Sequence, residues 1–575
     1  MVTDSLLLIE DYTHLMAPPS LKRAPPGKFL ISFPENKGQT WNYSLNKKLK
    51  TRTPGAFRAF DVKALLGPDA KIDLYEWKDL VYPNPEAERE KHYPRPYCAI
   101  THVWQCGLEA IKRAPEDREL VVTTKKRSEK NTKPQTINWL GLQQIAAAAD
   151  QLSCQYLWLD FLCIDQVDRG SDVDSEKGFQ LMNMANIYKF TRYVIVMIGG
   201  IAAVQSVQGS TTWMDRAWPL QESSINTEPS LVLIRWDFKV HDFHVPVEGA
   251  PDYHVQLKPV GNSGTYLISL RNLLEMAILS STRLSTILDV KEFRVKCLDG
   301  SREGAASEKL RSALLAVIRG VQENNDGLKW SGAWRSMLMR TSSRPSDIAY
   351  SVTGLFDVAL DLGLEDRPLD DAFRELMRRA AAKHGNMAWL TAGGFDGSLL
   401  PRHPASGLMP CAPEVEAHDL PVYMVGSKEM VSDQLIDGTT NYIPSKNFKI
   451  KFDTDSQPHI VCAPMYSVER IQDISLSKDG PNKEQIKLGG VEGLCHYRGD
   501  AKGMAVLVGE VAHWSHLPQQ TSSAVGGAQS DSWEEAYLNV EGYQYVLFMS
   551  NDHNKWSVCG DGVWAPRNPI NDGIS

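Results

Sequence analysis

The sequence has 575 residues and a formal charge of −8, from 62 Lys and Arg against 70 Asp and Glu, so it offers no domain-wide basic field for nucleic-acid binding. At about 100 to 200 residues per domain, this length predicts roughly three or four folded units. A hydrophobic content of 42% with 23% charged residues is typical of globular proteins and excludes collagen, wholesale disorder and a small disulfide scaffold.

Residues 1–94 are Pro-rich and mixed in pattern, and we interpret them as an N-terminal lead-in segment. From Tyr97 onward, short apolar runs alternate with segments of helical period, which is the order typical of a parallel sheet. The second of these runs continues as far as residue 165, as in a strand covered on both faces. The pattern predicts an α/β domain over 95–240, with strands over 97–104, 156–160 and 193–198 and helices over 136–153 and 175–190.

Helical patterns dominate a predicted region over 265–415. Its clearest helix runs from Asp370 to Gly385, because acidic residues begin it, basic residues lie near its end and a glycine follows. Further helices are expected over 266–279, 310–322 and 346–360. Over 420–575, short strands alternate with Gly, Asn and Asp turns, so we expect a small β-rich C-terminal domain.

Cysteine usage and apolar stretches bear on the compartment. The nine cysteines contain no Cys-x-x-Cys pair, which argues against a zinc ribbon and a disulfide framework. No signal-peptide core is recognisable, and the most apolar stretch, 193–204, is shorter than the ~20 residues that span a bilayer. We expect an intracellular, cytoplasmic protein without a membrane span. The basic run Lys125–Arg127 would also suit nuclear import, although a solvated loop explains it at least as well.

Three segments carry residues with chemical potential. They are Thr101–Trp104 at the end of the first predicted strand, Asp160–Asp168 after the second, and Arg216–Glu222. Ligands of open α/β sheets bind beyond the carboxyl ends of the strands, so the first two segments fall in the expected crevice. The third segment can join them only through folding.

Asp160 and Glu222 are the carboxylates of greatest interest. Asp160 ends an apolar strand, where an ionised carboxylate needs water or a partner, such as a ligand hydroxyl or Arg216. Glu222 falls in the first turn of a helix that is predicted to begin at or just before Pro219. The helix dipole favours the ionised form of Glu222 and burial against Trp218 opposes it, so the sign of its pKa shift stays open. Residue chemistry alone favours a structural Glu222, paired with Arg216 or capping a backbone amide.

Other candidates are weaker. Asp165 and Asp168 have the oxygen ligands that Mg²⁺ prefers, yet their spacing shows no ligand geometry, so no metal is expected. His102 is a lone imidazole in an apolar strand and is interpreted as a core residue. Cys163 has no neighbouring group in the sequence that would activate a thiolate. The common nucleotide-binding motifs are absent from the sequence.

Taken in order, three stretches resemble the three blocks of the fungal heterokaryon incompatibility (HET) domain: Tyr97–Trp104, Tyr156–Gln166 and Arg216–Glu222. Asp347–Tyr350 and Gly354–Phe356 are similar to a motif that often follows this domain. Two residues depart from the family pattern, since Gln105 stands where Gly is usual and Pro219 where Thr is common. These departures bear on the turn after the first strand and on the start of the last helix.

The resemblance implies a role in fungal non-self recognition, in which activation by a protein trigger or partner leads to incompatibility and programmed cell death. The domain is also distantly similar to the Toll/interleukin-1 receptor (TIR) fold, some members of which cleave NAD at the nicotinamide glycosidic bond. In those enzymes a Glu lies four residues after a Trp, as Glu222 follows Trp218. This likeness implies NAD as a substrate, no bound cofactor, Glu222 as catalytic, and Trp104, Asp160, Arg216 and Trp218 as ligand-binding.

Two alternatives to an enzyme stay open. The first is a non-enzymatic signalling module that acts by homo-oligomerisation or by recruiting a partner, with a structural Glu222. The second is a degenerate paralogue without killing activity, which the departures at Gln105 and Pro219 suggest.

Overall fold

The computed structural model describes most of the region from 135 to 360 and shorter stretches elsewhere. The described residues are 27–31, 41–43, 57–67, 72–77, 97–103, 119–122, 135–164, 180–201, 204–245, 253–261, 264–278, 281–302, 304–360, 368–384, 388–391, 400–401, 410–416, 419–425, 427–436, 440–444, 449–452, 458–462, 465–475, 482–488, 491–499, 504–513, 543–552 and 555–566.

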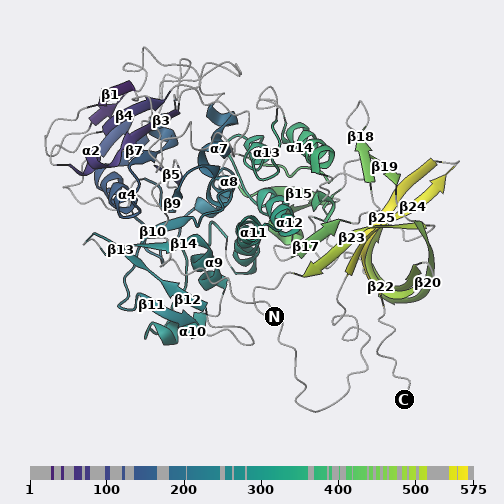
Figure 1. The fold of residues 1–575 in the computed structure, drawn as a ribbon. Coiled ribbons are helices and arrows are strands. Elements are labelled where there is room, and N and C mark those ends of the chain that lie inside the picture. The colour runs from purple at the N-terminus through teal and green to yellow at the C-terminus, as the bar shows by residue number, and fades with distance from the viewer. Residues whose placement is uncertain are drawn as a thin grey trace.

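A nine-stranded mixed sheet organises the first half of the described chain (Figure 1). Its four inner strands are parallel and lie in the order β8 (Tyr156–Trp158), β5 (Tyr97–His102), β9 (Tyr193–Met197) and β10 (Leu231–Arg235). All six residues of β5 are buried, as expected for a strand covered on both faces. The predicted parallel sheet is therefore confirmed for these inner strands.

Antiparallel strands extend this sheet at both edges. Beside β8 lie β3 (Phe57–Asp61), β4 (Ile72–Trp77) and β1 (Gly27–Ile31), and beside β10 lie β14 (Thr265–Ser269) and β13 (Lys258–Val260). The segment expected to be a lead-in thus contributes three strands to the sheet. A charged residue interrupts each of them, Lys28 in β1, Arg58 in β3 and Asp73 in β4, so none is a continuous apolar run like those of the inner strands.

Short helices connect and cover the parallel strands. The described ones are α2 (Val62–Leu66), α4 (Trp139–Gln151), α5 (Asp160–Cys163), α7 (Met184–Lys189), η2 (Trp213–Asp215) and α8 (Pro219–Ser224). Helix α4 packs against α2 and β8, and α8 packs against β5, β9 and α7. Smaller sheets flank this core: β2 (Trp41–Tyr43), β6 (Glu119–Val122) and β7 (Gln135–Asn138) form one, and β11 (Asp242–Val245) and β12 (Tyr253–Gln256) form another.

Two predicted elements are divided in the structure. The apolar run from 156 to 165 is a strand only as far as Trp158, and a helical turn begins at Asp160, whose Oδ1 accepts a hydrogen bond from Phe161 N at 2.6 Å. The helix expected over 266–279 is the strand β14 followed by α9 (Leu270–Ile278). In both cases an apolar run continues through a change of backbone conformation, so hydrophobicity alone does not locate the boundary.

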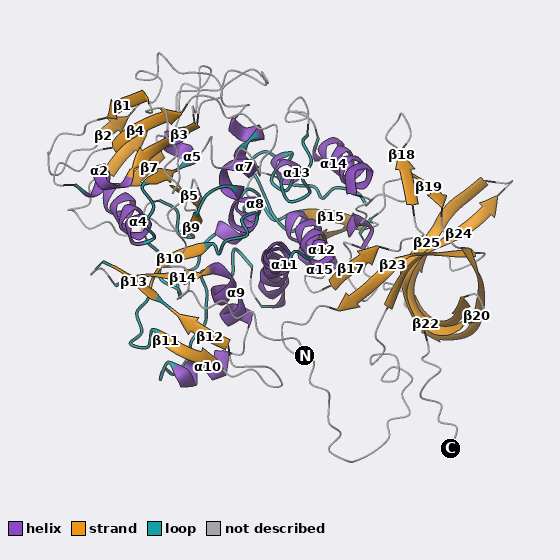
Figure 2. Ribbon diagram, viewed as in Figure 1, coloured by secondary structure: helices purple, strands orange, loops and turns teal. Residues whose placement is uncertain are grey.

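Most helices of the middle region lie between the mixed sheet and the C-terminal strands, whereas α10 (Ser281–Ile287) lies beside β11 (Figure 2). The helices of this region also include α11 (Ala305–Gln322), α12 (Asp326–Leu338), α13 (Asp347–Tyr350), α14 (Leu369–His384) and η4 (Ala388–Thr391). Helix α14 has Asp370 and Asp371 in its first turn and Lys383 and His384 in its last, as its end charges predict. The helix expected over 346–360 is restricted to α13, and turns continue to residue 357.

The C-terminal part is rich in strands. A seven-stranded sheet has the order β17 (Thr440–Pro444), β23 (Met504–His513), β20 (Met465–Ser475), β21 (Asn482–Leu488), β22 (Val491–Gly499), β25 (Lys555–Pro566) and β24 (Tyr543–Asp552). Pairing of β23 with β24 closes it on itself. Two hairpins and a short helix accompany it: β15 (Val422–Val425) with β16 (Lys428–Val431), β18 (Lys449–Phe452) with β19 (Pro458–Cys462), and α15 (Ser432–Leu435). Among the described helices, none combines the length and apolarity that crossing a bilayer requires.

Candidate functional site

Side chains from three distant segments meet at the carboxyl ends of the parallel strands. Thr101 and His102 end β5, Asp160 follows β8, and Glu222 belongs to α8, which packs against β5. Thr101 Oγ1 donates a hydrogen bond to Glu222 Oε2 at 2.6 Å, across 121 positions of sequence. His102 Nε2 lies 2.7 Å from Asp160 Oδ1 in an ion pair. We call Thr101, His102, Asp160 and Glu222 the rim cluster.

Local sequence explains how α8 delivers Glu222 to this place. Pro219 is the first helical residue, where its fixed φ and missing N–H are well tolerated, so the predicted helix start is confirmed. The hydroxyls of Ser223 and Ser224 donate to the carbonyls of Pro219 and Leu220, four residues earlier. Because these hydroxyls are satisfied within the helix, all six residues of α8 can be buried, and its acidic side chain lies inside the domain.

Glu222 is only 5% exposed, and its electrostatics follow from that burial. Burial and, to a lesser extent, the nearby charge of Asp160 raise the pKa of the Glu222 carboxyl to about 8. The hydrogen bond from Thr101, the charge of His102 and a hydrogen bond with Tyr188 oppose this rise without cancelling it. The Glu222 carboxyl is therefore mostly protonated at neutral pH. The sign that the sequence left open is resolved, because burial outweighs the dipole of a short helix.

The ion pair of His102 and Asp160 forms the other half of the rim cluster. Burial disfavours a charged imidazole, but the charge of Asp160 and its hydrogen bond prevail and raise the pKa of His102 above its usual value. His102 was expected to be a core residue, and it is buried at 5% exposure while its ring pairs with Asp160. The Asp160 side chain is the more exposed of this pair, at 11%.

Tyr188 completes the surroundings of Glu222, and sequence reasoning did not identify it. Its hydroxyl donates to the Ile100 carbonyl at 2.8 Å, and burial raises the pKa of this phenol well above its ordinary value. Nothing in the spacing of Tyr188 indicates this role, because the contact depends on how α7 packs beside β5. Thr101 and His102 did carry a signal, since two polar residues directly end an apolar strand.

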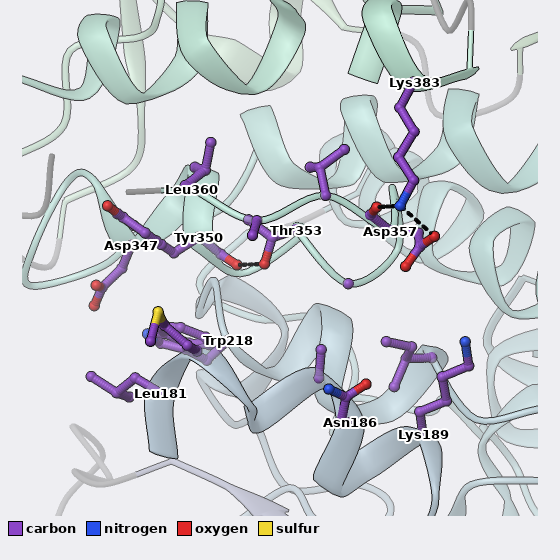
Figure 3. A pocket seen from close by; sticks show the side chains of 16 residues that line it. Leu181, Asn186, Lys189, Trp218, Asp347, Tyr350, Thr353, Asp357, Leu360 and Lys383 are labelled. Atoms are coloured by element: carbon purple, nitrogen blue, oxygen red, sulfur yellow. Dashed lines mark hydrogen bonds and ion pairs between the residues drawn. The ribbon is translucent and has the colours of Figure 1, made fainter. Parts of the chain in front are cut away.

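Arg216 and Trp218 face other surroundings. Burial lowers the pKa of Arg216, while the charges of Asp347 and Asp215 oppose that change. Trp218 is half-buried and lines a cavity of about 300 Å³ together with Asp347 and Tyr350 (Figure 3). Of the described residues that line this cavity, none belongs to the rim cluster. The structure thus separates the predicted site residues into two neighbourhoods.

Several predicted residues fall outside the described part of the chain. These are Trp104, Gln105, Asp165, Asp168 and the basic run Lys125–Arg127. Where the chain is described, no group of three or more His, Cys, Asp or Glu side chains is arranged to hold a metal ion. Burial raises the pKa of the Cys163 thiol to about 12, so this residue is a thiol and not a nucleophilic thiolate at neutral pH.

The rim cluster resembles a general acid–base arrangement in its chemistry. A buried carboxyl group beside another negative charge ionises less easily, which favours its protonated form. Here the pKa of Glu222 is raised, while Asp160 is paired with an imidazole. A protonated carboxyl and a negative charge side by side can donate a hydrogen bond to a substrate hydroxyl and stabilise a developing positive charge.

Comparisons with known proteins support one assignment. Residues 97–211 match a family model described as Heterokaryon incompatibility protein (HET), which confirms the resemblance seen in the sequence. The matched range includes Thr101, His102 and Asp160, whereas Glu222 lies just beyond it. Neither the comparison with curated proteins nor that with solved structures gives a significant match.

Proposed function

From the HET domain at residues 97–211, we propose that this heterokaryon incompatibility-type protein is an effector of fungal non-self recognition. Its activation by a protein trigger would lead to incompatibility and programmed cell death. The chemical step that we propose is hydrolysis of the nicotinamide glycosidic bond of NAD or a related nucleotide. The observation that supports it most is the position of a buried, protonated Glu222 near the Asp160–His102 pair, at the carboxyl ends of parallel strands.

The chemistry assigns each carboxyl group a different task. Glu222 would hold the ribose by donating a hydrogen bond from its carboxyl group to a sugar hydroxyl. The negative charge of Asp160 would stabilise the oxocarbenium ion that develops as the bond from the ribose C1′ to the nicotinamide nitrogen breaks. The bonding electron pair leaves with nicotinamide, which becomes neutral. Water then adds to C1′ and releases a proton, giving ADP-ribose from NAD.

The low exposure of the rim cluster is expected to limit the activity of the resting protein. Glu222 is 5% exposed and the Asp160 side chain 11%, so a nucleotide cannot reach both groups without a rearrangement. We therefore expect the isolated chain to be almost inactive and its activity to rise on forced oligomerisation or on binding of the trigger. This dependence would suit an effector that must stay silent until recognition occurs.

Expression of Glu222→Ala in fungal cells tests the proposal, because alanine removes the hydrogen-bond donor whereas glutamine would keep one. The wild-type chain, expressed as an inducible oligomerised fusion, is expected to deplete cellular NAD and reduce viability. Glu222→Ala should leave both near the level of uninduced cells, since removing one such donor typically costs roughly 10²- to 10³-fold in rate. Glu228→Ala, a substitution of a partly exposed glutamate outside the cluster, serves as the matched control and should kill like the wild type.

A second candidate is the non-enzymatic signalling module, and the burial of Glu222 favours it. A 5%-exposed carboxyl that accepts a hydrogen bond from Thr101 also suits a structural role. If Glu222→Ala is present at the wild-type level and kills without any loss of NAD, assembly or partner recruitment is the function. A variant that loses both killing and NAD depletion is expected only if the protein is an enzyme.

A further inference from the structure

The cavity lined by Trp218 lies between two parts of the molecule that are distant in sequence. One wall comes from α7, the residues just before it and the two residues that flank α8, and the other comes from α13, the turns after it and Lys383 of α14 (Figure 3). We call this boundary the seam. The volume of about 300 Å³ is at the lower end of the range of small-molecule sites.

One end of the cavity carries an excess of positive charge. Lys383 Nζ donates to Asp357 Oδ2 at 2.7 Å and to the Asp357 carbonyl, and Lys189 lies at the same end (Figure 3). Two ammonium groups thus accompany one carboxylate. The Lys383 side chain is 48% exposed, so its charge is accessible from the cavity side. An anionic group at this end would accept charge-assisted hydrogen bonds from both lysines.

The other end suits a ring. Trp218 and Leu181 lie there (Figure 3), and the half-buried indole of Trp218 offers a surface for stacking. Asp347 also lies at this end, but its negative charge is offset by attraction to Arg216. This end therefore suits an uncharged planar group, while the two lysines attract an anionic group to the opposite end.

The residues between these ends can orient a ligand. Asn186 lines the middle of the cavity with its side-chain amide, and Thr353 presents a hydroxyl whose proton is donated to the Tyr350 carbonyl at 2.9 Å. The Thr353 oxygen can therefore accept a hydrogen bond from a ligand. These groups could hydrogen-bond a polar linker, such as a sugar, that joins the ring of the ligand to its anionic group.

The seam itself is closely packed beside the cavity. Gly354 N donates to Gln221 Oε1 at 2.6 Å, and a Cβ on Gly354 would lie 2.4 Å from the Cβ of Ala185. The turn after α13 thus packs directly on α7 and α8, and α8 is the helix that carries Glu222. A molecule in the cavity would contact both walls and favour the closed seam by mass action.

We propose that this cavity binds a small aromatic anion, with a planar ring at Trp218 and a phosphate or carboxylate at Lys189 and Lys383. The bound molecule would fasten the HET domain to the helical region. This site is separate from the rim cluster, and the proposal does not depend on NAD cleavage.

Calorimetric titration of the full-length protein tests the proposal with three probes: AMP, indole-3-acetate and adenosine. At least one of the two anions is expected to bind with a Kd below about 1 mM, and at least tenfold more tightly than uncharged adenosine. Binding of AMP alone identifies phosphate as the recognised group, and binding of indole-3-acetate alone identifies carboxylate. The exposed Lys189 allows Lys189→Ala without loss of folding, and this change should weaken the anion about tenfold or more.

Lys239→Ala, at an exposed lysine away from the cavity, is the matched control and should leave the Kd unchanged. The proposal is overturned if neither anion binds more tightly than adenosine. It is equally overturned if an anion binds and Lys189→Ala does not alter its affinity, because the anion then occupies another place.

Discussion

Glu222→Gln is expected to raise the melting temperature of the protein by several degrees at pH 8 and to change it little at pH 4.5. The pKa of this carboxyl is about 8 in the fold, against an ordinary value of 4.5. Below pH 4.5 the group is protonated in both the folded and the unfolded chain. Between these values the unfolded chain releases the proton and the folded chain keeps it, so folding loses about 1.36 kcal/mol for each pH unit. Glutamine does not ionise and escapes this loss.

Thermal unfolding at several pH values measures this effect, with Glu228→Gln as the control. The stability gain of Glu222→Gln should grow from about pH 4.5 and level off above about pH 8, where both forms of the chain are ionised. A gain of the same size at every pH would show that the carboxyl is not protonated in the fold.

Asp215→Ala is expected to lower the free energy of unfolding by about 3 to 5 kcal/mol, because it removes the carboxylate that neutralises the buried guanidinium of Arg302. Asp215 Oδ1 accepts from Arg302 Nη1 at 2.5 Å and Oδ2 from Ser301 N at 2.7 Å. The side chains of Asp215 and Arg302 are only 4% and 1% exposed. Arg340 adds a second buried cation that attracts Asp215, and burial lowers the pKa of Arg340 to about 9.

Urea denaturation of Asp215→Ala beside Asp237→Ala gives the comparison. Asp237 pairs with Arg235 at 3.2 Å, but the two side chains are 50% and 57% exposed, so that pair should contribute about 0 to 1 kcal/mol. Equal, small effects of the two substitutions would mean that Asp215 is not the central anion of a buried cluster.

The parts of the fold that could be predicted are those with an unambiguous local cause. Strands β5 and β9 are continuous apolar runs because both faces of the inner sheet are covered. Helix α14 is marked by charges that complement its dipole at both ends. The change from strand to helix at Asp160 has no such local mark, because apolar residues continue through the turn. The backbone changes direction where the Asp160 carboxylate accepts a hydrogen bond from the next amide.

The rim cluster could be predicted only in part, for a different reason. Asp160 and Glu222 were identifiable as carboxylates in plausible positions, but their partners depend on contacts between residues 58 and 121 positions apart. The pKa of Glu222 depended on two opposing effects, and their balance is decided by how completely α8 is buried. The surroundings of Arg216 and Trp218 depend on how the helical region packs against α8. No local sequence pattern in the HET segments specifies that packing.

Release of nicotinamide from NAD by the oligomerised full-length protein, measured from pH 6 to 9, tests the central claim most directly. The proposed mechanism predicts turnover that falls as the pH rises through about 8, where Glu222 loses its proton. It also predicts that Glu222→Ala abolishes this turnover while Glu228→Ala retains it. No release at any pH, or release that Glu222→Ala leaves intact, would contradict the assignment of chemistry to the rim cluster.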